Sequence, residues 1–162
     1  MESNLTYRYL TYQELELFDE DFSEFLYTKR INRFEWRLLL DYSSDDALII
    51  LAKYSEQTFE KVMKTVYFLE RRTISTLELI SCANEEMISI LLELPAKSHI
   101  NFLKFDPIKE IGGINHFRSA QVSSNYHISR EKDIFTLIES GYKVVNGRLY
   151  NQIESLRKTQ LN

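Results

Sequence analysis

Apolar residues recur at helical spacing near the beginning of the chain. Five of them fall on one face of a helix, with acidic side chains on the other: Leu15, Phe18, Phe22, Phe25 and Leu26. Thr11 is placed to cap this helix, because Glu14 lies three residues later and completes a capping box. The pattern therefore predicts a helix over residues 12–27.

The same start signal appears again before two further helices. Asn32 with Glu35 predicts the beginning of a helix over residues 33–42. After it, apolar and small residues alternate at spacings of three and four: Leu48, Ala52, Ser55, Phe59, Val62, Val66 and Leu69. This stripe predicts a long helix over residues 45–71, which Ser55 could divide. Such a stripe is typical of the core face of a central helix, and a coiled-coil seam would show the same spacing.

The period then changes from helical to alternating, which predicts a β-hairpin over residues 77–94. Pairing Leu77 with Leu92 leaves a two-residue loop at Asn84–Glu85. A shift of two residues would place Glu78 opposite Glu93, and like charges in that position are unfavourable. In the preferred register the hairpin turns one apolar face inward: Leu77, Leu79, Ile88, Ile90 and Leu92.

Helical spacing returns towards the end of the chain. After Ser129 the pattern predicts a helix over about 130–140, which Gly141 would end. Asn146–Gly147 is a dipeptide typical of a tight turn and predicts a small hairpin. A final helix is expected over about 149–158.

Residues 96–128 show no clear period, and only 100–105 suggests a third strand. Taken together the elements predict an α+β fold. It has N-terminal helices at about 12–27, 33–42 and 45–71 packed on a small antiparallel sheet built on hairpin 77–94, with C-terminal helices at about 130–140 and 149–158. A chain of 162 residues is most economically a single domain, residues 1–162.

The distribution of charge divides this domain at Pro95. Residues 1–95 carry 10 Lys and Arg against 18 Asp and Glu, a net charge of −8. Residues 96–162 carry 10 against 6, a net charge of +4. The acidic, helical segment 1–95 and the basic, aromatic-rich segment 96–162 can therefore bind each other or oppositely charged partners.

The sequence contains few features that indicate the cellular compartment of the protein. Cys82 is the single cysteine, which excludes an internal disulfide and fits a reducing compartment. The N-terminal residues lack the basic and apolar regions of a signal peptide. The longest apolar run, Ala47–Ala52, is far shorter than the roughly 20 residues that span a bilayer. We expect a cytoplasmic protein without a membrane partner.

No complete chemical motif is present, so we expect no catalytic residue, no cofactor and no metal site. His99, His116 and His127 do not have the spacing of metal ligands. Cys82 falls within a predicted strand, where a small buried residue is the ordinary role. Gly112–Gly113 matches neither a P-loop nor a dinucleotide-binding pattern.

Lys and Arg residues are intermixed with aromatic residues over 97–132, and this composition is typical of an interaction surface. The candidate interface residues are Phe102, Lys104, Phe105, His116, Arg118 and Tyr126. The expected function is a non-enzymatic protein–protein interaction or adaptor module, whose partner is an unidentified protein or a second copy. The alternative is a nucleic-acid-associated accessory protein that uses the same segment. A weaker alternative is a small hydrolase or metal-dependent enzyme that uses His116 and His127.

Several segments also resemble a family of small uncharacterised bacterial proteins, a domain of unknown function. The resemblance rests on Tyr7–Thr11, Phe22–Leu26, Glu35–Trp36 and Phe59–Glu70, in that order along the chain. It is best over residues 6–94, looser over residues 131–156 and absent over residues 96–128. It implies a bacterial cytoplasmic protein and supplies no activity, ligand or catalytic residue.

Overall fold

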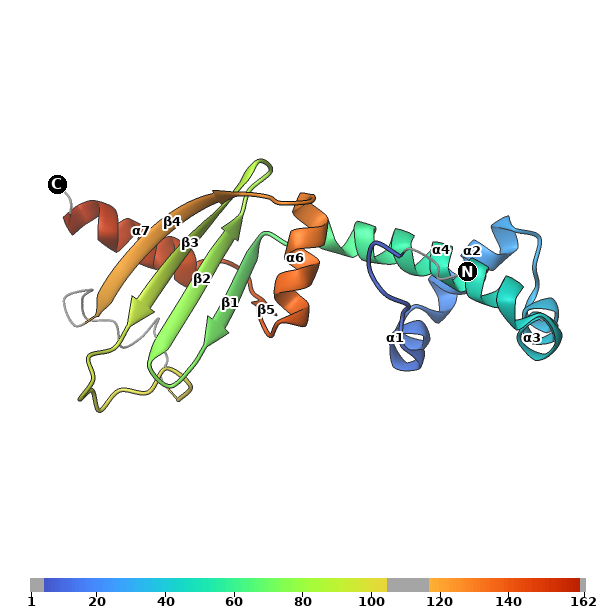
Figure 1. Cartoon of the computed structure of the whole chain (residues 1–162), viewed down its shortest axis with the longest axis horizontal. Coiled ribbons are helices and arrows are strands. Elements are labelled where there is room, and N and C mark those ends of the chain that lie inside the picture. The colour runs from blue at the N-terminus through green and yellow to red at the C-terminus, as the bar shows by residue number, and fades with distance from the viewer. Residues whose placement is uncertain (1–4, 105–116, 161–162) are drawn as a thin grey trace. The chain divides into compact units, whose positions relative to one another are not determined.

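The computed structural model describes residues 5–104 and 117–160. The chain forms two compact units, residues 1–62 and 63–162, which we call the helical unit and the sheet unit (Figure 1). The boundary between them lies well before Pro95, where the charge distribution changes. The helical unit has 7 Lys and Arg against 13 Asp and Glu, so most of the net negative charge belongs to it.

The helical unit consists of helices that begin where the capping signals predict. They are α1 (Tyr12–Leu17), α2 (Asp19–Thr28), α3 (Arg33–Tyr42) and α4 (Ser44–Met63), which ends at the first residue of the sheet unit. Thr11 and Asn32 each form the complete capping box with the glutamate three residues later. These two predictions are confirmed, and both are local interactions of the backbone.

The predicted single helix over residues 12–27 is wrong, because the chain breaks at Phe18. This residue ends α1 and precedes α2, with φ −108° and ψ 22°. Asp19, Glu20 and Asp21 follow it and form the first turn of α2. Three carboxylates are favourable at the positive N-terminal end of a new helix, which explains why the break falls here.

The core of the helical unit forms between α2, α4 and the segment before α1. The rings of Phe22 and Tyr54 lie 4.7 Å apart between their centroids. The hydroxyl of Ser55 is buried and accepts a hydrogen bond of 3.0 Å from the amide of Leu10. Ser55 therefore does not divide α4, but holds the N-terminal segment against it.

The predicted helix over residues 45–71 is wrong beyond Met63. Residues Phe68–Arg72 form strand β1 instead. Val66 and Leu69 are both buried, as the stripe required, but in the sheet unit. The positions of Val66 and Leu69 continue the helical stripe, so the pattern does not mark where the helix ends, and pairing with the following strand determined the structure of Phe68–Arg72.

The sheet unit contains a five-stranded antiparallel sheet in the order β4-β3-β2-β1-β5 (Figure 1). Its strands are β1, β2 (Thr76–Cys82), β3 (Glu86–Glu93), β4 (Arg118–Asn125) and β5 (Lys143–Val144), and its helices are α6 (Arg130–Glu139) and α7 (Arg148–Gln160). Leu77 pairs with Leu92 and Leu79 with Ile90, so the predicted hairpin register is confirmed. The α+β class is confirmed as well.

One face of the sheet is covered by α7, which runs behind the strands in Figure 1. The core on this face includes Leu77, Leu79, Ile90 and Leu92 from the hairpin, with Leu149, Tyr150 and Ile153 from α7. Ile88 packs at its margin. The predicted inward face of the hairpin is therefore correct.

Two other predictions for the sheet unit are wrong. Residues 100–104 form turns rather than a strand, with the amide of Lys104 bonded to the carbonyl of Asn101 at 3.0 Å. Asn146–Gly147 leads directly into α7 instead of turning a hairpin, since the Asn146 side chain accepts a hydrogen bond from the amide of Arg148. The residues before it pair with β1, whose Phe68 carbonyl accepts from the Val145 amide.

Candidate interaction surfaces

The edge strand β4 is exposed along its whole length. Each of its eight residues, Arg118–Asn125, is exposed to solvent. Among the described residues, β3 is its only neighbour in the sheet. Because successive side chains of a strand point to opposite faces, neither face of β4 is covered by the core.

The hydrogen bonds of the neighbouring strands determine which backbone groups of β4 point outward. The amide of Ala83 donates to Glu86, and that of Leu94 donates to Ser75, so the even-numbered residues of β3 bond to β2. The odd-numbered residues of β3 therefore bond to the even-numbered residues of β4. It follows that four residues direct their amide and carbonyl groups away from the sheet: Ser119, Gln121, Ser123 and Asn125.

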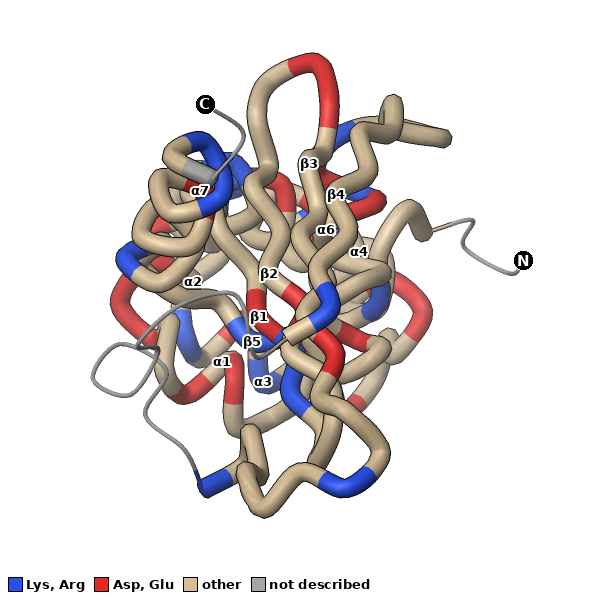
Figure 2. The backbone as a smooth tube through the Cα atoms, turned by 90° about the vertical axis from the view of Figure 1, so that its left-hand side faces the viewer, with Lys and Arg blue, Asp and Glu red and all other residues tan. Residues whose placement is uncertain are grey.

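This edge lacks the features that usually prevent strands from associating. Within β4 only Arg118 is charged (Figure 2). The strand contains no proline or glycine. The opposite edge differs, because β5 is only two residues long and contains Lys143. Short edge strands and lysine are common protective features of natural sheets, so β4 is the less protected of the two edges over residues 5–104 and 117–160.

The predicted interface residues have different positions in the structure. Arg118 begins β4 and is exposed, Tyr126 follows its last residue and is half-buried, and Lys104 is exposed. Phe102 is fully buried in the core beneath the sheet, so its ring is not available to a partner. An interface role for the Phe102 side chain does not fit this position. Phe105 and His116 lie outside the described residues.

The chain that follows β4 is held firmly. The hydroxyl of Tyr126 donates to the carbonyl of Ala83 at 2.6 Å, and burial raises the pKa of this tyrosine to about 12. Asp133 is buried and accepts hydrogen bonds from the amides of His127 and Ile128 at 2.5 and 3.4 Å. These contacts fix the last residue of β4 relative to β3.

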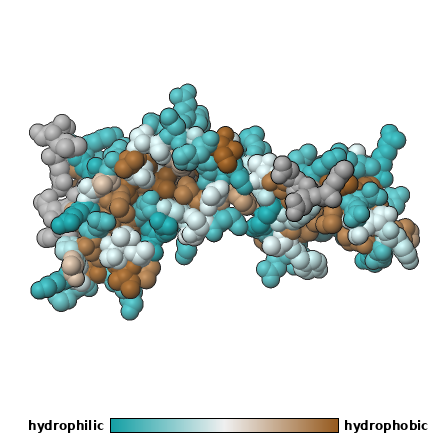
Figure 3. Space-filling view, viewed as in Figure 1, coloured by the Kyte–Doolittle hydropathy of each residue, from teal (hydrophilic) through white to brown (hydrophobic). Residues whose placement is uncertain are grey.

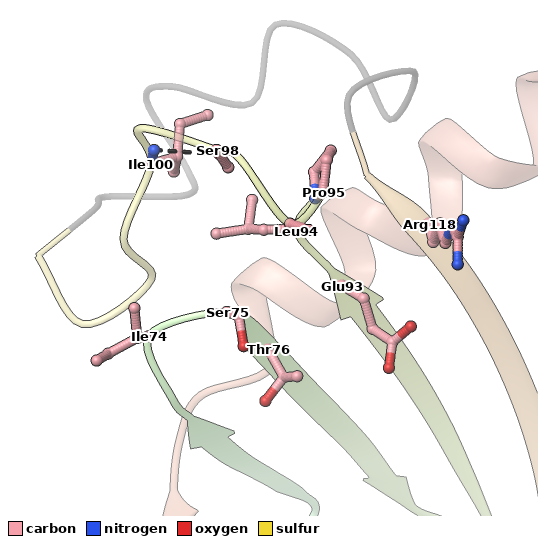
Figure 4. A pocket seen from close by; sticks show the side chains of 10 residues that line it. Ile74, Ser75, Thr76, Glu93, Leu94, Pro95, Ser98, Ile100 and Arg118 are labelled. Carbon is pink, nitrogen blue, oxygen red and sulfur yellow. Dashed lines mark hydrogen bonds between the residues drawn. The ribbon is translucent and has the colours of Figure 1, made fainter.

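A cavity of about 590 Å³ lies at the end of the sheet where β4 begins (Figure 4). Thr76, Glu93 and Arg118 form a row across β2, β3 and β4, since Thr76 pairs with Glu93 and Glu93 with Arg118. Apolar residues of the adjoining loops complete the wall: Ile74, Leu94, Pro95 and Ile100.

The described wall of this cavity includes no histidine or cysteine. Over the described residues as a whole, no group of three or more metal-binding side chains comes together. The guanidinium of Arg118, the carboxylate of Glu93 and the hydroxyl groups of the wall can form hydrogen bonds with the polar groups of a peptide. The cavity therefore extends the polar surface of β4.

A second surface, on the helical unit, was not anticipated from the sequence. Helix α3 has six apolar residues among ten, and none of the ten is buried. Its exposed apolar side chains, with those of the first turns of α4, form what we call the α3 patch: Phe34, Leu38, Leu40, Tyr42, Leu48 and Ile49. Hydrophobic side chains are visible at the surface at this end of the helical unit (Figure 3). Apolar residues on every side of α3 are the sequence signal that could have revealed it.

Beside the α3 patch lies a largely apolar groove of about 380 Å³, the α3 groove. Its apolar lining residues are Tyr12, Leu15, Phe22, Leu26, Trp36, Leu40 and Leu51. The ring of Trp36 packs edge-on against Phe22, with centroids 5.3 Å apart, and is itself only half-buried.

Two arginines stand at the rim of the α3 groove. Arg33 is held by Asp19 at 2.8 Å and by the hydroxyl of Ser23 at 3.1 Å. Arg37 is exposed and makes no ion pair with any residue that the structure describes. Glu16 and Asp19 line the groove as well, so its apolar floor is bordered by charges of both signs.

Both surfaces fall within a family match that spans nearly the whole chain. Residues 5–158 match the model of a family described as a Family of unknown function (DUF6495). The chain belongs to this family. The resemblance to a domain of unknown function, inferred from the residues, is thus confirmed. The DUF6495 match includes the α3 groove and all of β4. Searches of curated proteins and of solved structures gave no match.

Proposed function

We propose that this DUF6495 protein is a non-enzymatic protein–protein interaction module of the bacterial cytoplasm, and that it binds a helix of its partner in the α3 groove. The observation that carries the proposal is α3 itself, which has six apolar residues and no buried one. Exposed apolar side chains gathered on one helix of a folded domain commonly mark a binding site.

The exposed apolar residues supply the driving force for binding. Among the residues that line the groove, Tyr12 is 76% exposed and Leu40 is 50% exposed. Covering one such side chain completely contributes about 1.5–3 kcal/mol. A few of them, together with the half-buried Trp36, are enough to anchor a partner, because a handful of aromatic and aliphatic residues usually dominates an interface.

The shape and charge of the α3 groove favour an amphipathic helix as the ligand. The groove runs between α-helices and has an apolar floor, which suits the side chains that a helix presents at positions i, i+3 and i+4. Arg37 at the rim favours a carboxylate next to these apolar residues. We therefore expect a partner helix with a large apolar face flanked by charged residues, including an Asp or Glu that meets Arg37 and a Lys or Arg that meets Glu16.

Two further observations support a protein ligand over nucleic acid. The rings of Phe102 and Phe117 stack on each other with centroids 5.6 Å apart, and Phe102 is fully buried. These rings are therefore occupied by the core and not presented to bases, as single-strand binding requires. The chain as a whole is also acidic, with 20 Lys and Arg against 24 Asp and Glu, which disfavours contact with phosphates.

The cytoplasmic location rests on composition. Cys82 is buried and is the single cysteine, as expected of a protein in a reducing compartment. Within the described ranges, no helix has the length and hydrophobicity that crossing a bilayer requires.

The test compares three baits in pull-downs from lysate: the wild-type chain, Leu40→Asp and Leu17→Asp. Leu40 lines the groove, whereas Leu17 is 82% exposed on α1 and lies outside it, so the same substitution serves as the matched control. We expect a stoichiometric partner with the wild type and with Leu17→Asp, and its loss with Leu40→Asp.

The second step uses Trp36, the single tryptophan, as a reporter inside the groove. A synthetic peptide of the recovered partner's amphipathic helix should shift Trp36 emission to shorter wavelength as the ring loses contact with water. Retention of the partner by Leu40→Asp, or an unchanged Trp36 spectrum at saturating peptide, would contradict binding in the α3 groove.

A further inference from the structure

We propose that β4 pairs with β4 of a second copy, antiparallel about a two-fold axis at Val122, so that two five-stranded sheets join into one. The proposal rests on the sheet unit alone and is independent of the α3 groove. It starts from an eight-residue exposed edge strand whose outward backbone groups meet no other strand of the described chain.

The outward groups define the hydrogen bonds of such a pair. In a two-fold antiparallel pair, residues that face each other lie on the same face of the sheet, so their numbers have an even sum. With Val122 facing itself, Ser119 pairs with Asn125 of the second copy, and Gln121 pairs with Ser123. All four residues direct their amide and carbonyl groups outward, which allows about eight backbone hydrogen bonds.

The side chains favour this register. Val122 is 59% exposed, and in the proposed pair it lies beside Val122 of the second copy. Opposite residues that are not hydrogen-bonded approach to about 4.5 Å between Cα atoms, which gives the two valines close contact. Arg118 comes opposite Tyr126 of the second copy, where a guanidinium can lie over an aromatic ring. The two Arg118 side chains are at opposite ends of the pair and do not repel each other.

A second copy of this chain is the favoured partner of β4, because pairing with it gives a dimer that presents no further β4 edge. After β4 pairs with β4, the remaining edges of the joined sheet, as far as the structure describes it, are the two β5 strands. Each β5 is two residues long and carries Lys143, so neither edge invites further strands. A two-fold pair therefore removes the less protected edge in one closed step, whereas an open arrangement would leave it available for aggregation.

Disulfide trapping tests the register. Val122→Cys places two thiols at the two-fold axis, within the Cα distance that a disulfide spans. We expect mild oxidation to convert this variant largely to a covalent dimer. Ala120→Cys is the matched control, because Ala120 faces Ser124 rather than itself, and we expect it to stay uncoupled. Cys82 is buried, with its pKa raised to about 11 by that burial, and does not interfere. Equal trapping of both variants, or no trapping of Val122→Cys, would overturn the proposed register.

Solution mass, measured by light scattering over a concentration series from micromolar to millimolar, tests the pairing itself. Gln121→Pro removes an outward amide and leaves the bonds to β3 intact, so we expect a folded monomer. Val122→Asp, at an exposed position, places two carboxylates face to face and should also give a monomer. Circular dichroism identifies a variant that has lost its fold. The solution mass of the other, folded variant then shows whether dimerisation depends on β4. A monomeric wild type, or a dimer that survives in either folded variant, would refute the proposal.

Discussion

The guanidinium of Arg130 donates a hydrogen bond of 3.2 Å to the carbonyl of Met63, the last residue of α4. It donates further bonds of 2.5 Å to the carbonyl of Val66 and 3.0 Å to that of Cys82. One side chain from a distant stretch of sequence therefore holds the residues that lead into β1 beside the end of β2. Only 10% of that side chain is exposed.

We predict that Arg130→Met destabilises the sheet unit by about 3 kcal/mol, because it leaves several carbonyls without a donor. The labelling of Cys82 by a thiol reagent in increasing urea reports the opening of this unit, since Cys82 is buried within it. Arg148→Met is the matched control: Arg148 is exposed, and its replacement should change stability by less than about 0.5 kcal/mol. Equal urea midpoints for the two variants would refute a role for Arg130 in holding the start of the sheet unit.

Phe102 provides a second prediction, because it is fully buried in the core that α7 covers. Phe102→Ala should destabilise the sheet unit by about 3–5 kcal/mol, through lost burial and the cavity left behind. The neighbouring Leu103 is 58% exposed, so Leu103→Ala should be nearly neutral. Urea unfolding followed by Cys82 labelling separates the two. A Phe102→Ala variant as stable as Leu103→Ala would show that this ring is not a core residue.

The pair Arg8–Glu14 predicts an acid-sensitive step in the helical unit. Hydrogen bonding to Arg8, at 2.7 Å, lowers the pKa of Glu14 to about 2. Because the folded state favours the charged carboxylate, its contribution is complete above the unfolded-state pKa and disappears as pH falls from about 4.5 to 2. Glu14→Gln should therefore be less stable than the wild type at neutral pH, and the difference should become smaller as pH falls through 4 and 3.

Trp36 fluorescence in urea at pH 7, 4 and 3 measures this difference for the helical unit. Glu24→Gln, at an exposed position in α2, is the control and should follow the wild type at every pH. A stability difference between Glu14→Gln and the wild type that stays constant with pH would contradict the ion pair.

Some of the candidate site was accessible from sequence and some was not. Arg118 and Tyr126 are recognisable in the sequence as a basic and an aromatic residue within a basic segment. In the structure Arg118 begins β4 and Tyr126 follows its last residue. Phe102 fits the same pattern but lies in the core, because an aromatic residue among cations looks the same whether it is buried or exposed. The α3 groove was missed, since a helix that is apolar on several sides is usually a buried one.

Features that residues close together in the chain decide could be predicted from the sequence alone. The capping boxes at Thr11 and Asn32 and the hairpin register from Leu77 to Leu92 depend on residues close in the chain or on strict alternation. Only the tertiary structure decided that β1 is a strand and that β4 exists. In the sequence Ser119–Asn125 only Ala120 and Val122 are apolar, which is too short an alternation to predict a strand, and its extended backbone is held by pairing with β3. Those hydrogen bonds join residues some thirty positions apart, and no local pattern records them.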